Sequence, residues 1–92
     1  MALRVGQQVW IRCRVQPGPF SDESLVTIET IEGPVAGFID TDELRKGPPG
    51  SEQSVRGVVR SIEKTFVEVW IRGSFFTTNG LANVRPELAM AA

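Results

Sequence analysis

The 92-residue chain contains no histidine and no tyrosine. Histidine is the side chain that most often serves as a general base near neutral pH or as a metal ligand. The sequence also lacks a C-x-x-C pair, a phosphate-binding G-x-x-x-x-G-K loop and a serine in a nucleophile elbow. We therefore expect a protein that is not an enzyme, with no catalytic residues, no metal and no cofactor.

Cysteine is almost absent as well. Cys13 is the single cysteine, so the chain cannot form an intramolecular disulfide. It follows Val9 and Ile11 at a spacing of two residues, which predicts a side chain on the buried side of a strand. We expect Cys13 to be a small core residue rather than a nucleophile.

Long apolar runs are missing too. No segment approaches the ~18 consecutive apolar residues of a transmembrane helix, and residues 1–4 carry no apolar signal region. The net charge is −1, from 10 basic and 11 acidic residues, which gives no bulk attraction to nucleic acid or anionic membranes. These observations predict a soluble cytoplasmic protein that does not associate with a membrane.

The composition that remains is that of an ordinary folded domain. Apolar residues make up 41% of the chain and charged residues 23%. A chain of this length has room for a single core, so we expect one domain over residues 1–92.

The first half of the chain, residues 5–45, predicts three strands. Apolar and polar or aromatic side chains alternate over residues 9–15, and this period of two indicates a half-buried strand. Residues 25–30 are β-branched and alternating, and residues 35–39 form a third apolar run. The loop 16–24 separates the first two strands, since it contains proline, glycine, serine and aspartate.

The second half, residues 52–88, repeats this order. Strands are predicted over 55–62, 66–72 and 81–84, and the dipeptide Asn79-Gly80 is typical of a type I′ hairpin turn. Each half resembles a three-stranded meander, which cannot bury its apolar face alone. The Pro/Gly-rich loop 46–53 is expected to join the two half-repeats.

Short helical turns are expected after each half. Asp40 is expected to cap one turn, with Glu43 at capping-box spacing. Pro86 suits the first position of a final short helix, and residues 89–92 are expected to fray. The predicted fold is therefore all-β, a single small β-barrel of about six strands, OB-like or SH3-like in topology.

The alternation assigns side chains to two faces. The inward set is apolar and comprises Val9, Ile11, Cys13, Val15, Val26, Ile28, Val55, Val59, Val67, Val69 and Ile71. The outward set comprises Trp10, Arg12, Arg14, Arg56, Arg60, Phe66, Trp70 and Arg72. The first set should form the core, and the second contains the candidate binding residues.

One stretch of the second half resembles a known family. Residues 55–69 read V-x-G-x-V-x-x-I-x(4)-V-x-V, with Gly80-Leu81 and Glu87-Leu88 downstream, which is similar to S1-type OB-folds. The segment from Gly37-Phe38-Ile39 to Leu44 equally resembles the third strand of an S1-like barrel that runs from residue 6 to residue 71. Valine strands interrupted by glycine also occur in SH3-like barrels.

The resemblance implies a barrel that binds single-stranded nucleic acid across its second and third strands. The family presents aromatic residues there, for which Phe38 is the candidate in this chain, followed by a histidine. Asp40 stands at the position of that histidine.

Two tetrapeptides carry the main binding hypothesis. Val-Trp-Ile-Arg occurs at residues 9–12 and again at 69–72, and each copy places its tryptophan and arginine on one side of a strand. Exposed tryptophan beside arginine is typical of protein-interface hot spots and of surfaces that stack single strands. Packing of both tryptophans under the loop 16–24 or the C-terminal helix is the alternative. Glu29 and Glu68 face the same way as the arginines and would partly cancel their charge, which favours a solvated, cross-strand-paired surface. The predicted binding residues are Trp10, Arg12, Arg14, Phe20, Phe38, Arg56, Arg60, Trp70 and Arg72.

Phe20 lies at the tip of the predicted loop 16–24 and is either a contact residue or, by a slight preference, a side chain that folds back to cap the barrel. The predicted function is non-catalytic binding. The negative net charge and the absence of histidine favour a protein partner or a homodimer, and single-stranded RNA is the alternative partner.

Overall fold

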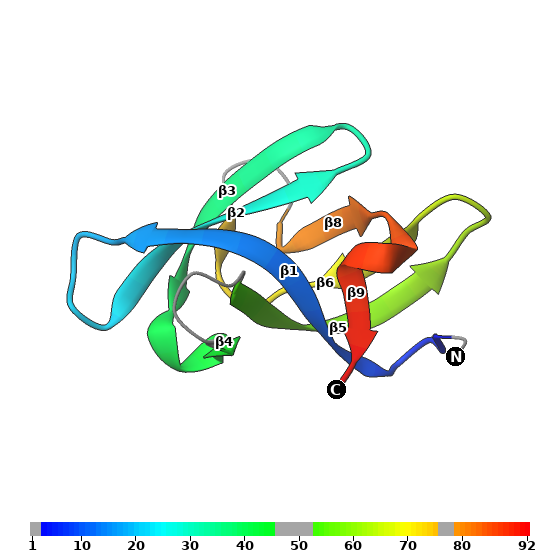
Figure 1. Cartoon of the computed structure of the whole chain (residues 1–92), viewed down its shortest axis with the longest axis horizontal. Coiled ribbons are helices and arrows are strands. Elements are labelled where there is room, and N and C mark those ends of the chain that lie inside the picture. Colours follow the sequence, from blue (N-terminus) through cyan, green and yellow to red (C-terminus); the bar gives the residue numbers. More distant parts are fainter. Residues whose placement is uncertain (1–2, 46–52, 76–78) are drawn as a thin grey trace.

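Two three-stranded meanders form the barrel in the computed structural model, which describes residues 3–45, 53–75 and 79–92. The first meander comprises β1 (Gln8–Pro17), β2 (Glu23–Thr30) and β3 (Gly33–Asp40), and the second comprises β5 (Gln53–Ile62), β6 (Val67–Trp70) and β8 (Leu81–Val84). These six strands pair antiparallel in the order β3-β2-β1-β5-β6-β8 (Figure 1). The predicted all-β barrel of about six strands is thus confirmed.

The first strand, β1, is long and curved (Figure 1), and it pairs with strands of both meanders. Its first part pairs with β5 from Gln8 to Cys13, and its second part pairs with β2 from Arg14 to Pro17. Figure 1 shows β1 running across the molecule between the β2–β3 hairpin and β5. The predicted connection 46–53 lies outside the described residues except for Gln53, where β5 begins.

The barrel is nearly closed on its other side. The Ile31 N–H in the β2–β3 turn donates a hydrogen bond to the Asn83 carbonyl oxygen of β8 at 2.9 Å. The Asn83 side-chain amide also donates to the Glu32 carboxylate at 3.2 Å. These bonds join the ends of the two meanders at a place where β3 and β8 do not pair directly within the described residues.

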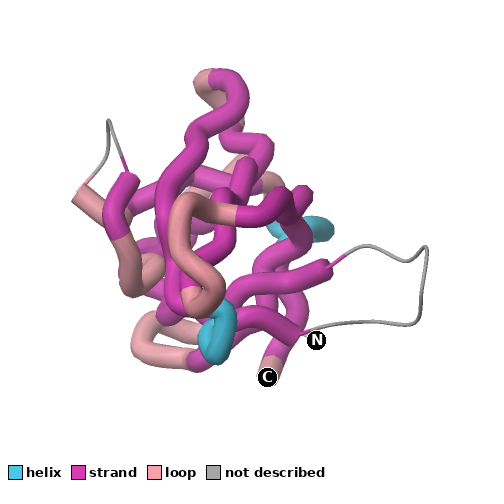
Figure 2. Tube along the Cα trace, turned by 90° about the vertical axis from the view of Figure 1, so that its left-hand side faces the viewer, coloured by secondary structure: helices cyan, strands magenta, loops and turns pink. Residues whose placement is uncertain are grey.

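Five short elements complete the fold. They are two single-turn 3-10 helices and three short strands: η1 (Thr41–Glu43), β4 (Leu44–Arg45), β7 (Ser74–Phe75), η2 (Pro86–Leu88) and β9 (Ala89–Ala91). Figure 2 shows the two helical turns at separate places on the barrel. Short helical turns were predicted at both places, and both are present.

Two local predictions are wrong. Asp40 occupies the N-cap position of η1, but its side chain makes no capping hydrogen bond. Residues 89–91 do not fray; they form β9, which pairs antiparallel with β1. The Ala92 N–H extends this pairing by donating to the Gln8 carbonyl oxygen at 3.1 Å. Strand pairing satisfies backbone groups that a frayed end would leave to water.

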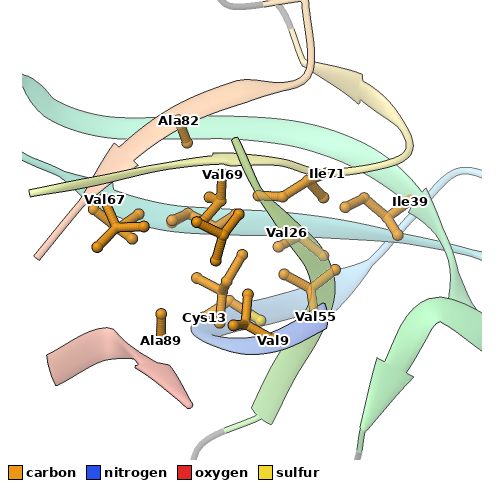
Figure 3. Close-up of a cluster of buried hydrophobic side chains, with 14 residues drawn as sticks. Val9, Cys13, Val26, Ile39, Val55, Val67, Val69, Ile71, Ala82 and Ala89 are labelled. Atoms are coloured by element: carbon orange, nitrogen blue, oxygen red, sulfur yellow. The ribbon is translucent and has the colours of Figure 1, made fainter. Parts of the chain in front are cut away.

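The core consists of the inward-facing side chains that the alternation predicts. Val15 is only partly buried and packs against the cluster, whereas the other members of the predicted set are buried. Figure 3 shows side chains from β1, β2, β3, β5, β6 and β8 converging in one cluster, which also includes Ile39 and Ala82. Cys13 is buried within it, as predicted.

Candidate binding face

The strand register brings both predicted Trp/Arg segments to one side of the barrel. Trp10 lies opposite Arg56 of β5 and, on its other side, opposite Met90 of β9. In the next row Gln8 lies opposite Val58, which in turn lies opposite Trp70 of β6. The Trp/Arg face is defined here by Trp10, Arg12, Arg45, Arg56, Trp70 and Arg72.

Trp10 is half-buried, and two arginines lie against its ring: Arg56 from β5 and Arg45 from β4. The Arg56 guanidinium carbon lies 5.4 Å from the Trp10 ring centroid, and that of Arg45 lies 5.9 Å from it. Both distances are within the range of cation–π attraction. Arg45 reaches this position because β4 places it opposite Ser54 of β5. Arg12 of β1 lies opposite the same Ser54 on its other side. Two guanidinium groups therefore lie against the indole ring.

Trp70 is the more exposed of the two tryptophans, with 38% of its surface accessible. Its indole lies over the Asn79-Gly80 turn, where a β-carbon on Gly80 would approach the indole Nε1 to 3.0 Å. Asn79 and Gly80 both have positive φ values, 52° and 85°, as the predicted type I′ turn requires. A side chain at position 80 would therefore collide with the Trp70 indole, so Gly80 is needed both for its positive φ and for this contact.

A shallow groove of about 190 Å³ lies between Trp70 and Arg56. It forms where β5 changes its neighbour, since β6 pairs with β5 from Val58 onward and β4 pairs with Ser54 and Val55. Its lining comprises Gln8, Glu43, Arg56, Gly57, Val58, Trp70 and Arg72. An indole and two guanidinium groups therefore face one small space.

Arginine predominates in the groove lining. Arg56 and Arg72 are its basic residues, and Glu43 is the single carboxylate among the described residues of that lining. The Glu43 carboxylate lies 4.0 Å from the Arg56 Nε, and half of the Arg56 side chain is exposed. An ion pair this long and exposed contributes little to stability, so Arg56 keeps most of its capacity to bind an anion.

A second opening has the opposite charge. It lies between the β2–β3 turn and β8, has a volume of about 450 Å³, and includes Glu32, Glu68 and Asn83 in its lining. No basic side chain is found among the described residues of that lining. A chain with a net charge of −1 thus presents a basic groove and an acidic one.

The other predicted site residues lie elsewhere. Arg14 is at the far part of β1, where it forms an ion pair with Glu29 of β2 at 3.1 Å. Arg60 is exposed at the register shift of β5 and does not line the groove. Phe38 is half-buried on β3, opposite Leu25 of β2. The structure therefore brings Trp10, Arg56, Trp70 and Arg72 together at the groove. Arg12 lines a separate opening with Arg14 and Glu29, and Arg60, Phe38 and Phe20 lie elsewhere.

Phe20 requires a correction. It is 67% exposed at the β1–β2 loop and does not fold back over the barrel end. Backbone hydrogen bonds from Gly18 to Glu23 and from Glu23 to Phe20 close the loop tightly, so its tip projects away from the core.

Three residues of this region were not predicted from the sequence. Arg45 and Glu43 flank the end of η1, and their contact with Trp10 and Arg56 depends on the β4–β5 register. Met90 lies opposite Trp10 only because residues 89–91 form a strand. Each contact joins segments that are far apart in sequence, and no local pattern signals it.

Comparisons with known proteins do not extend this description, since no family model, no curated protein and no solved structure matches the chain. Within residues 3–45, 53–75 and 79–92, no helix has the length and apolar character needed to cross a membrane. The same residues contain no group of three or more histidine, cysteine or acidic side chains arranged to hold a metal ion.

Proposed function

We propose that this protein is a non-catalytic binding module that engages a protein partner through the Trp/Arg face. The observation that carries the proposal is that β1, β4, β5, β6 and the residues just after β6 place two tryptophans and four arginines on one surface. Tryptophan and arginine are the residues most enriched at the energetic centres of protein interfaces. Trp70 supplies exposed apolar surface, and the arginines around it supply hydrogen-bond donors.

The excess of arginine favours a different protein over a second copy of this chain. A two-fold symmetric contact would place the same face on both sides of the interface. Arginines would then oppose arginines, which costs free energy. A partner with acidic side chains would complement the face instead.

Single-stranded nucleic acid is the second candidate, because Arg56 and Arg72 lie beside the exposed Trp70. Non-specific single-strand binders stack successive bases on several aromatic side chains. Here Trp10 already has Arg45 and Arg56 against its ring, so Trp70 is the better exposed stacking surface. Phe38, which the S1-type resemblance implies as a contact, lies on β3 and outside the Trp/Arg face. This arrangement favours the protein partner.

Site-specific photo-crosslinking tests the proposal. A photoreactive amino acid replaces Gln8, which lines the groove, or Glu29, which is exposed on β2 as a matched control. After irradiation in a nuclease-treated lysate of the source cells, we expect a discrete protein adduct from position 8 and none from position 29.

Two results would contradict the proposal. Adducts of equal yield from both positions would indicate non-specific contact. An adduct that forms from position 8 only before nuclease treatment would indicate nucleic acid as the partner.

A further inference from the structure

The groove beside Trp70 contains an internal ion pair that is poorly made. In the β4–β5 register Leu44 lies opposite Val55, so the preceding residue, Glu43, comes opposite Arg56. The Glu43 carboxylate reaches only to 4.0 Å from the Arg56 Nε, which is beyond hydrogen-bond distance. An arginine binds a carboxylate best through two short parallel hydrogen bonds, and Glu43 does not provide them.

We propose that this groove receives a carboxylate side chain, aspartate or glutamate, from the partner, and that Glu43 is its internal competitor in the free protein. The proposal rests on the proposed function, because it names the group that the same face would recognise. Arg56 and Arg72 are the charge partners, and the Trp70 indole with Val58 is the apolar wall for the methylene carbons of the incoming side chain.

The second guanidinium strengthens this assignment. Arg72 lines the groove and forms no ion pair with the described residues. The two arginines give the groove one cationic group held loosely by Glu43 and one that is uncompensated. A single incoming carboxylate would therefore neutralise the net charge of the groove, while the negative charge of Glu43 opposes its binding to Arg56.

The dimensions of the groove favour a side chain over a larger ligand. Sites for small molecules and cofactors usually enclose ~300–1,000 Å³, whereas this groove has about 190 Å³. The outward-facing side chain of Val58, which is short, lies in its lining. A carboxylate on one or two methylene groups fits such a space, and a nucleotide extends well beyond it.

The test uses the indole N–H signals of Trp10 and Trp70 in a nitrogen–proton correlation spectrum of the whole chain at low ionic strength. Hexaglutamate peptide is the probe, hexaglutamine is the uncharged control and hexauridylate represents nucleic acid. We expect hexaglutamate to shift the Trp70 signal more than the Trp10 signal, and hexaglutamine to shift neither.

Variants then assign the charges. Glu43→Gln should increase hexaglutamate affinity about fourfold, the effect of removing one unit charge ~5 Å away in water, and Arg56→Gln should decrease it by a similar factor. Arg14→Gln, which removes an exposed arginine outside the groove, should leave the affinity unchanged. Dispersed amide signals verify that each variant is folded.

Specific results would overturn the inference. Unchanged or weaker affinity in Glu43→Gln would exclude Glu43 as a competitor. Shifts with hexauridylate but not hexaglutamate would assign the groove to nucleic acid. No shift with either probe, together with a protein adduct from position 8, would refute the carboxylate site and leave the proposed function standing. If the photoreactive residue at position 8 forms no protein adduct, the proposed function itself is refuted.

Discussion

Val59→Asp is expected to abolish folding or to lower the free energy of unfolding by at least ~3–5 kcal/mol, the cost of an uncompensated buried charge. Val59 has no accessible surface and lies on the inner side of β5, among core side chains from both meanders. Small domains have total stabilities of ~5–15 kcal/mol, so this loss is a large part of the whole. Urea denaturation followed by circular dichroism measures it.

The neighbouring residue provides the control. Val58→Asp makes the same chemical change one position earlier, where the side chain lies on the outer surface between Gln8 and Trp70. We expect its effect on the free energy of unfolding to stay within ~1 kcal/mol. Similar destabilisation by both substitutions would show that the inner and outer faces of β5 are not those described here.

Arg56→Glu is expected to have the largest effect on recognition. The substitution replaces the cation opposite Trp10 with an anion, and it places that anion next to Glu43. A change of two unit charges ~5 Å from a bound carboxylate corresponds to a loss of roughly 15-fold in affinity. Titration of the Trp70 indole signal with hexaglutamate measures this loss, and the Trp10 signal reports the change beside its ring.

Arg60→Glu is the matched control for that variant. Arg60 is also exposed on β5, and its substitution changes the net charge by the same amount, but it does not line the groove. We expect a change in affinity of no more than about threefold, because Arg60 lies four residues along the strand from Arg56, roughly 13 Å, and Coulomb attraction falls with distance. Equal losses in both variants would indicate that net charge, rather than the groove, controls binding.

The barrel could be predicted because its local signals are strong. Strands β1 and β5 alternate with a period of two, so Val9, Ile11, Val55 and Val59 identify the inner face directly. The Asn79-Gly80 dipeptide identifies a turn with two positive φ values. Both features depend on residues close in sequence, and each is decided by steric or hydrophobic effects that act locally.

The site could be predicted only in part, because its geometry depends on register. The sequence places Trp10 and Arg12 on one side of a strand, but it does not say which strand lies beside them. The β1–β5 pairing brings Arg56 to Trp10, and the β4–β5 pairing brings Arg45 and Glu43 to the same region. Likewise, residues 89–91 show no strand pattern in the sequence. They form β9 because they pair with Val9–Ile11 of β1 on the side opposite β5.

The resemblance to S1-type and SH3-like barrels stays a prediction, as do cytoplasmic localisation and an internal duplication. The structure contains two meanders in the predicted order, with β1 paired to β5 between them. It places the candidate aromatic of the S1-type pattern, Phe38, away from the Trp/Arg face. Our proposal for binding therefore depends on the face itself and not on the resemblance.

Although the chain has a net charge of −1, we expect a positive local potential at the groove beside Trp70. Paramagnetic relaxation of backbone amides by anionic and cationic nitroxides of equal size measures the local potential most directly. We expect stronger relaxation by the anionic nitroxide at Gln8, Arg56 and Trp70, which line the groove. We expect stronger relaxation by the cationic nitroxide at Glu32, Glu68 and Asn83, which line the acidic opening. The same sign of potential at both sets of residues would contradict this expectation.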